Sequence, residues 1–258
     1  MQNHDNHNHN HKRDNSADKL TTYQVWDRPS RIFHWVNVLL VLSLVFVGLI
    51  MLFRKDLGID ALEAKIKLKE LHVIIGYLFA ANLLVRIIWG FMDNRYAKFS
   101  HNIPNIRAIK QYRTALKDGR NPQYVGHNPL GKLAILTIML TLTLIMATGL
   151  FRAGTDIYYP PFGSAITQYI AADDADATAI KPYDETGVDK SKLAEIKPVK
   201  SIAGKVHLYS VYFLMLLIGL HVAAVIQAER RHQPGIISAM FSGKKSIKGP
   251  VEDKDSFL

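Results

Sequence analysis

Four long apolar segments constrain the fold of this chain more than any other feature of its sequence. They cover residues 32–53, 71–92, 133–151 and 206–226. Each has about the 20 residues that a helix needs to cross the hydrocarbon core of a bilayer. Polar connections separate them, which is why the mean hydropathy of the whole chain is only +0.03. The sequence therefore predicts an all-α integral membrane protein with a bundle of four transmembrane helices.

Basic residues predict how this bundle lies in the membrane. Lys and Arg gather before the first apolar segment, between the second and third, and after the fourth, while the other two connections mix acidic and basic residues. Cytoplasmic loops of membrane proteins carry the excess of Lys and Arg. We therefore expect a multi-pass protein of the bacterial cytoplasmic (inner) membrane with both termini in the cytoplasm. This topology explains the net charge of +10, and no nucleic-acid partner is expected because no aromatic and basic recognition motif accompanies it.

The polar segments divide the chain into a membrane domain and two tails. We expect residues 30–228 to form the four-helix domain, residues 1–29 a polar, His-rich cytoplasmic tail, and residues 229–258 a second cytoplasmic tail. The first apolar segment is too long for a cleaved signal peptide, so it is expected to stay in the protein. The tail sequence NHDNHNHNH leaves weak metal binding open, although nothing in it fixes four ligands in a closed geometry.

The last connection, residues 153–205, is far longer than the others and is expected on the periplasmic side. It contains the acidic stretch AADDADA at residues 171–177. Connections of this length are usually functional or unstructured. The segment is therefore either a docking surface for a partner or a solvated linker.

The chain contains no cysteine. This excludes haem attached covalently through a C-x-x-C-H motif, iron–sulfur clusters held by thiolates, and structural disulfides. Any redox group must therefore be held by other side chains, and histidine is the candidate.

Four of the eleven histidines lie within the apolar segments or at their ends: His34, His72, His207 and His221. In the expected topology His34 and His221 fall near the inner face, whereas His72 and His207 fall near the outer face. The interval between His207 and His221 is about 21 Å along a helix and about 40° short of four full turns, so both lie on nearly one face. The sequence predicts two stacked sites, His72 with His207 outside and His34 with His221 inside.

Paired imidazoles at two depths suit b-type haem, whose iron takes two axial nitrogens without covalent attachment of the porphyrin. Zinc would require more ligands, and the apolar segments contain no carboxylate to supply them. Membrane histidines also hydrogen-bond neighbouring helices, and a chain of them could relay protons in a haem-free anchor or transporter. A visible spectrum would distinguish these classes, because only the haem protein absorbs there.

Two further residues lie fourteen positions beyond a histidine. Arg86 follows His72 at this interval and reaches the inner level. Its guanidinium could neutralise a propionate of an inner haem or extend toward the cytoplasmic headgroups. Gly48 follows His34 and reaches the outer level. Its missing side chain leaves room for a porphyrin or allows close packing of helices.

Five motifs follow one another along the chain: RPSRIFHW at residues 28–35, ELHVIIGY at 70–77, RIIWGFMDNRYAKF at 86–99, GHNPLGKL at 126–133, and H-x13-H at 207–221. Together they resemble the prokaryotic cytochrome b561 family, which includes the b-type cytochrome subunits of nickel–iron hydrogenases. The resemblance implies four helices that hold two haems b, with His34, His72, His207 and His221 as axial ligands. It also implies electron transfer between the quinone pool and a redox partner.

The combined interpretation is a di-haem membrane cytochrome b that transfers electrons between quinone or quinol in the lipid and a periplasmic redox protein, such as a c-type cytochrome or a hydrogenase. The alternative within electron transfer is a dedicated cytochrome b subunit of a nickel–iron hydrogenase. No flavin or iron–sulfur motif is present, so the chain is expected to relay electrons, alone as a quinol:acceptor oxidoreductase or as a subunit of one. No catalytic residue is assigned. The type of quinone, the direction of electron flow, the partner and the formation of a homo-oligomer stay open.

Overall fold

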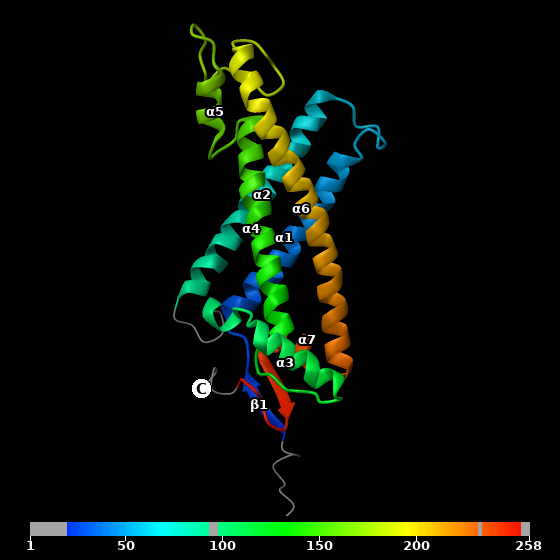
Figure 1. The fold of residues 1–258 in the computed structure, drawn as a ribbon. Helices are drawn as coiled ribbons and strands as arrows, with labels where there is room; N and C mark the ends of the chain where they lie inside the picture. Colours follow the sequence, from blue (N-terminus) through cyan, green and yellow to red (C-terminus); the bar gives the residue numbers. More distant parts are fainter. Residues whose placement is uncertain (1–19, 93–97, 232–233, 254–258) are drawn as a thin grey trace, which may run out of the picture.

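The computed structural model describes residues 20–92, 98–231 and 234–253. Within this part of the chain, four helices are long and apolar enough to cross a membrane. They are α1 (Arg28–Leu52), α2 (Leu62–Phe91), α4 (Pro129–Ile157) and α6 (Lys190–Arg231). α1 and α2 pack against each other and cross α4 and α6 obliquely (Figure 1). The predicted helical membrane bundle is confirmed. The His-rich sequence NHDNHNHNH lies outside the described residues.

Two of the sequence motifs are helix starts. The Asp27 side chain accepts a hydrogen bond from the Ser30 amide at the beginning of α1, and the Asn128 side chain accepts one from the Gly131 amide at the beginning of α4. Such caps satisfy amides that have no partner inside the helix. A proline stands in the first turn of each helix, where its missing N–H costs nothing. These caps fix where α1 begins and therefore the depth of His34.

The apolar core of the bundle lies halfway between the two predicted histidine levels. Its buried members come from all four long helices and are Val41, Phe79, Leu83, Leu142, Ile145 and Leu214. Leu214 is equally far in sequence from His207 and His221. Backbone packing is close between α1 and α2, between α2 and α4, and between α4 and α6. In the described part of the chain, α6 approaches α1 and α2 much less closely, and these are the helices that carry its partner histidines.

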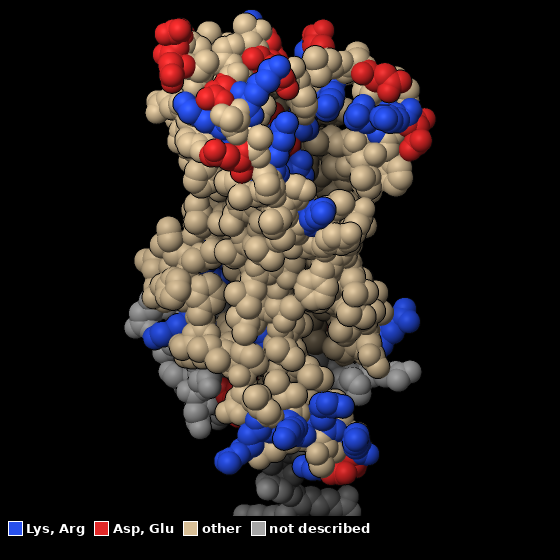
Figure 2. Space-filling model, turned by 45° about the horizontal axis from the view of Figure 1, so that its top comes forward, with Lys and Arg blue, Asp and Glu red and all other residues tan. Residues whose placement is uncertain are grey.

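Charged residues gather at both ends of the bundle and leave an apolar belt between them (Figure 2). Many large apolar side chains of this belt are exposed, among them Leu39 and Phe46, each 66% exposed. A soluble protein rarely exposes so large a contiguous apolar surface. Lipid in contact with this belt explains the pattern.

Three of the long helices extend beyond the predicted apolar segments at the end of the bundle that is expected to face the periplasm. α2 begins at Leu62 rather than residue 71, α4 ends at Ile157 rather than residue 151, and α6 begins at Lys190 rather than residue 206. The hydropathy of the sequence marks only the lipid-contacting part of a helix. Lys, Glu, Leu and Ala all favour helices in water as well, so the helices continue.

The connection between α4 and α6 is consequently shorter than the expected range of residues 153–205, and part of it has regular structure. Besides the ends of α4 and α6 it contains α5 (Gly163–Ile170). Ala171 and Val188 form an antiparallel bridge, and Lys192 on α6 donates to the carbonyl of Ala171. These contacts hold the acidic stretch at the outer end of the bundle.

A small sheet at the opposite end was not predicted. β1 (Leu20–Gln24) pairs antiparallel with β2 (Lys244–Lys248), in a register that joins Leu20 to Lys248. The short helices η2 (Phe99–Asn102), α3 (Ile106–Lys117) and α7 (Ile236–Ser242) lie at the same end. Where they are described, the two segments expected as separate tails are therefore bound to each other. The sequence gives only a weak indication of this sheet, because each strand has five residues and the two strands are distant in sequence.

Candidate functional site

The outer histidine pair comes together between α2 and α6. The ring centroids of His72 and His207 are 6.4 Å apart, and the ring planes are inclined by 75°. A metal ion binds an imidazole nitrogen at about 2 Å, so two imidazoles on opposite sides of one metal have nitrogens about 4 Å apart. The radius of each ring adds to this value and brings the centroid separation close to the observed one. The pair is therefore spaced for one metal atom between the rings.

Thr148 on α4 orients the His207 ring. Its hydroxyl oxygen lies 3.1 Å from His207 Nδ1 and 2.7 Å from the carbonyl oxygen of Leu144. The single hydroxyl proton goes to the carbonyl, so the hydroxyl oxygen accepts a hydrogen bond from Nδ1–H. Nε2 then keeps its lone pair for a metal, which is how a second residue fixes the tautomer of a ligating histidine. The sequence analysis missed Thr148, because nothing distinguishes it from the other threonines of α4.

Two glycines face the outer imidazoles. A Cβ atom added to Gly48 on α1 would lie 3.6 Å from His72 Cε1, and one added to Gly149 on α4 would lie 3.2 Å from His207 Cε1. Gly48 is thus at the outer level, where its interval from His34 predicted it. Gly149 was not predicted. The two positions leave the space beside both rings free of side chains, as a flat cofactor requires.

His72 has a further unusual property. Its Nδ1 atom is buried and has no hydrogen-bond partner among the described residues. Buried polar atoms are almost always paired, so each exception calls for an explanation.

The inner pair lies between α1 and α6. His34 and His221 are close enough for their rings to interact electrostatically. The edge of the His34 ring meets Trp35, with centroids 5.2 Å apart, and Trp35 stacks on Phe241 of α7 at 4.7 Å. The Trp35 indole also donates to the carbonyl of Met240. α7 therefore covers the inner pair at the end of the bundle.

Arg86 lies near a protein carboxylate that the sequence analysis did not consider. Its guanidinium interacts electrostatically with Asp27 and lies 5.4 Å from the ring centroid of Phe99. The Asp27 carboxylate also accepts from the Ser30 amide and the Trp89 indole. The role of Arg86 toward a propionate stays a prediction, with Asp27 as a competing anion.

His127 lies near the inner pair, although the sequence analysis placed it in a connection without a role. Its Nδ1 hydrogen-bonds the side-chain oxygen of Asn102 at 3.2 Å, and its ring packs 4.5 Å from Trp26. Burial, reinforced by nearby cations, lowers the pKa of His127 to about 3. The ring is neutral and serves the packing at this end of the bundle.

Among the described residues, His72 pairs with His207 and His34 with His221, and His127 lies near the inner pair. Over the described ranges, no set of three or more His, Cys, Asp or Glu side chains is placed to hold a metal ion. A zinc site would need such a set. Two imidazoles suffice for an iron whose other four ligands belong to a porphyrin, so the residues present fit haem b.

An open apolar groove lies between α4 and α6 beside the outer pair. Its lining includes Phe151, Ile202 and Val206, and Thr148 is the only polar residue in it. The lining of the groove is thus almost entirely apolar.

Known proteins share sequence with this chain. The sequence profile of the family described as prokaryotic cytochrome b561 matches residues 25–243. Three curated relatives carry the name probable Ni/Fe-hydrogenase B-type cytochrome subunit, the third of them for hydrogenase 1. The protein of Rhodobacter capsulatus is 31% identical over 147 residues, which cover 52% of this chain and 56% of the relative. That of Cupriavidus necator is 21% identical over 249 residues, or 90% and 91% of the two chains. That of Escherichia coli K12 is 28% identical over 147 residues, or 52% and 61%. The match thus spans little more than half of the first and third relatives and nearly all of the second.

Proposed function

We propose, given that this chain belongs to the prokaryotic cytochrome b561 family, that its four membrane histidines hold two haems b and form an electron path across the cytoplasmic membrane. Family membership makes the chain a membrane-bound b-type cytochrome that transfers electrons. The number of haems, their ligands and the substrates are the proposal. The observation that carries it is the 6.4 Å separation of the His72 and His207 rings, together with the tautomer that Thr148 selects.

The chain's own residues have three roles in this proposal. His72 and His207 bind the outer iron, and His34 and His221 bind the inner iron. Thr148 holds the His207 ring in the ligating orientation. The apolar core around Leu214 excludes water from the region between the outer and the inner histidine pair. It therefore keeps the dielectric constant of this region low. Bound haem supplies the one-electron chemistry, while the protein sets the position and the surroundings.

Quinone or quinol is the proposed substrate on the membrane side. The supporting observation is the apolar groove of α4 and α6, which reaches Thr148 next to the outer pair. A chain of isoprenoid units has the chemistry of this groove.

The second party is a redox protein that meets the outer, periplasmic end of the bundle. The relatives are named as subunits of nickel–iron hydrogenases, and these names favour a hydrogenase as the redox partner. In that second candidate function, electrons from hydrogen oxidation would enter at the outer haem. Copurification from the native membrane would identify the party, and a c-type cytochrome found in place of a hydrogenase would exclude the second candidate.

Haem counting tests the central proposal. Pyridine-haemochrome analysis against protein concentration should give two haems b per chain. His207→Ala should remove the outer haem and His221→Ala the inner one, so the two variants should lose spectrally different haems. One haem per chain, or loss of the same haem from both variants, would contradict the paired assignment. A purified protein without visible absorption would support the haem-free transporter instead.

A further inference from the structure

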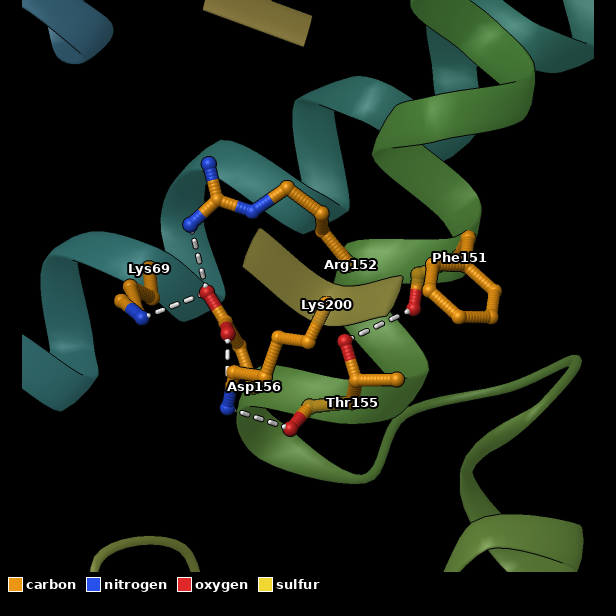
Figure 3. A network of polar contacts seen from close by, with 6 residues as sticks. All are labelled: Lys69, Phe151, Arg152, Thr155, Asp156 and Lys200. Atoms are coloured by element: carbon orange, nitrogen blue, oxygen red, sulfur yellow. Dashed lines mark hydrogen bonds and ion pairs between the residues drawn. The ribbon is translucent and has the colours of Figure 1, made fainter. Parts of the chain in front are cut away.

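A cluster of charged side chains stands at the outer ends of three helices (Figure 3). Its centre is Asp156 on α4, whose side chain is only 9% exposed. Lys69 of α2 contacts this carboxylate at 2.7 Å, Arg152 of α4 at 2.9 Å and Lys200 of α6 at 3.0 Å. We call these four residues the outer cluster.

The outer cluster carries more positive than negative charge. It contains three cations and one carboxylate, which leaves a surplus of two positive charges. In the described part of the chain, none of the three cations lies within ion-pair distance of another carboxylate. The side chains of Lys69, Arg152 and Lys200 are 16%, 34% and 39% exposed. Leaving charge uncompensated in such partly buried surroundings is costly, so the arrangement favours binding of an anionic ligand.

Arg152 has the largest unused capacity to bind such a ligand. A guanidinium has five N–H donors, and Nη2 of Arg152 donates to Asp156. Its Nε atom is buried without a hydrogen-bond partner among the described residues. Lys200 is better satisfied, because it also donates to the carbonyl of Thr155 at 2.8 Å.

The outer cluster lies directly outward of the outer histidine pair. The Arg152 guanidinium is 3.6 Å from a Cβ atom built on Gly204, which is about one helical turn before His207. It interacts electrostatically with both His72 and His207. Lys69 stands one turn before His72 on α2, and Arg152 stands one turn beyond Gly149 on α4. The charges therefore border the space between the rings on the side that faces water.

We infer that the outer cluster binds the two propionates of the outer haem, with Arg152 as the residue that contacts them and Asp156 as the residue that positions Arg152. This inference rests on the proposed function, because it requires a haem between His72 and His207. A haem carries two carboxylates at one edge, and their two negative charges equal the surplus of the cluster. Arg is the side chain best suited to carboxylates, since its planar fork donates two parallel hydrogen bonds.

The cluster also sets the redox potential of the outer haem. Positive charge nearby favours the electron-rich reduced state, so removing it lowers the midpoint potential. Removing the negative charge of Asp156 acts in the opposite direction. Opposite shifts would show that both charges act on the outer haem.

Redox titration of purified variants, followed in the visible spectrum, tests this inference. Arg152→Gln should lower the midpoint potential of the outer haem. At a fixed potential, the ratio of reduced to oxidised haem should fall at least tenfold, which corresponds to about 59 mV for one electron. Asp156→Asn should raise it, and the inner haem should keep its potential in both variants. Lys205→Gln is the matched control, because Lys205 is an exposed cation of α6 at similar depth and is not part of the cluster. Its effect should be small.

Each outcome distinguishes this inference from the proposed function. Unchanged outer potential in Arg152→Gln, with two haems still bound, would overturn the inference and leave the proposed function intact. A wild-type protein with fewer than two haems would overturn the proposed function first. If Arg152→Gln loses the outer haem, Asp156→Asn decides: a retained outer haem with a raised midpoint potential supports the inference, and an unchanged or lowered potential overturns it.

Discussion

Thr148 and Gly149 are neighbours on α4, and both act on His207 without being ligands. Thr148 contributes a hydrogen bond to Nδ1, whereas Gly149 contributes the absence of a side chain 3.2 Å from the ring. One fixes the direction in which the ring points, and the other keeps the space beside it free. At the scale of residues, the outer site is therefore defined as much by α4 as by the helices that carry the imidazoles.

Replacing Thr148 with Val should weaken the outer site. The variant keeps the shape of the side chain but removes the acceptor for Nδ1–H, and loss of such a partner lowers metal affinity by roughly 10–100-fold. Haem retention during dilution, followed by absorbance, measures this. Thr143→Val is the control, because the Thr143 hydroxyl donates to a carbonyl of its own helix and no contact with a histidine is found for it. Equal haem loss in both variants would contradict the role of Thr148.

Gly149→Ala should disturb the outer haem for a steric reason. The added methyl group would stand 3.2 Å from His207 Cε1, closer than ordinary contact, so the ring or the helix has to shift. The expected result is a changed spectrum or loss of the outer haem. Gly76→Ala is the matched control, since nothing lies within 4 Å of a Cβ atom added there. This variant should stabilise α2 by up to about 1 kcal/mol. Identical spectra of the two variants would show that Gly149 has no such role.

Arg86→Leu should lower the midpoint potential of the inner haem if the guanidinium neutralises a propionate. A positive charge near the haem favours the reduced state, so its removal lowers the potential. Redox titration that resolves the two haems measures the shift, with Asp27→Asn as the companion variant. An unchanged inner potential in Arg86→Leu would assign Arg86 to Asp27 or to the headgroups instead.

At the scale of elements, helical periodicity explains how much could be predicted. The expected topology put the starts of the second and fourth apolar segments, and with them His72 and His207, at one level, and the structure brings their rings together. Fourteen residues return a side chain to nearly the same face of a helix, and this interval placed Gly48 at the level of His72. Their role as ligands stays a prediction. Thr148 could not be found this way, because its partner is on another helix and threonines recur along α4. The water-exposed start of α6 at Lys190 was missed because hydropathy does not measure helix propensity.

The acidic stretch of the outer connection should affect association and not the haems. Asp173 and Asp174 are exposed, so Asp173→Asn with Asp174→Asn removes charge and leaves the Ala171–Val188 bridge in place. Electron exchange with the native periplasmic partner should slow at low salt, and the difference should vanish at high salt because screening removes steering. Stopped-flow kinetics measures this, with unchanged haem spectra as the internal control. The same rate in both proteins would identify the stretch as a solvated surface only. Deleting residues 171–197 would be a poorer test, since it removes the first turns of α6.

At the scale of the whole molecule, stability should fall in mild acid because of His127. Its pKa is about 3 in the folded protein against an ordinary value of 6.5. Between these values the unfolded chain binds a proton that the folded chain does not, so stability decreases as the pH falls through this window, by at most about 1.4 kcal/mol per pH unit. Unfolding in detergent, measured from pH 7 to 4, should show a shallower decline for His127→Gln than for the wild type. Parallel curves would rule out His127 as the source.

The pairing of β1 with β2 has a consequence for how the molecule is made. Thr22 and Ser246, which face each other in this sheet, are separated by 224 positions. A ribosome therefore delivers one strand long before the other, and all four spans can enter the bilayer while β1 still has an open edge. Unpaired strand edges attract other chains, so an interrupted translation product would present one. This end of the bundle, including the Phe241 contact over Trp35, can therefore close only after the last span has been made.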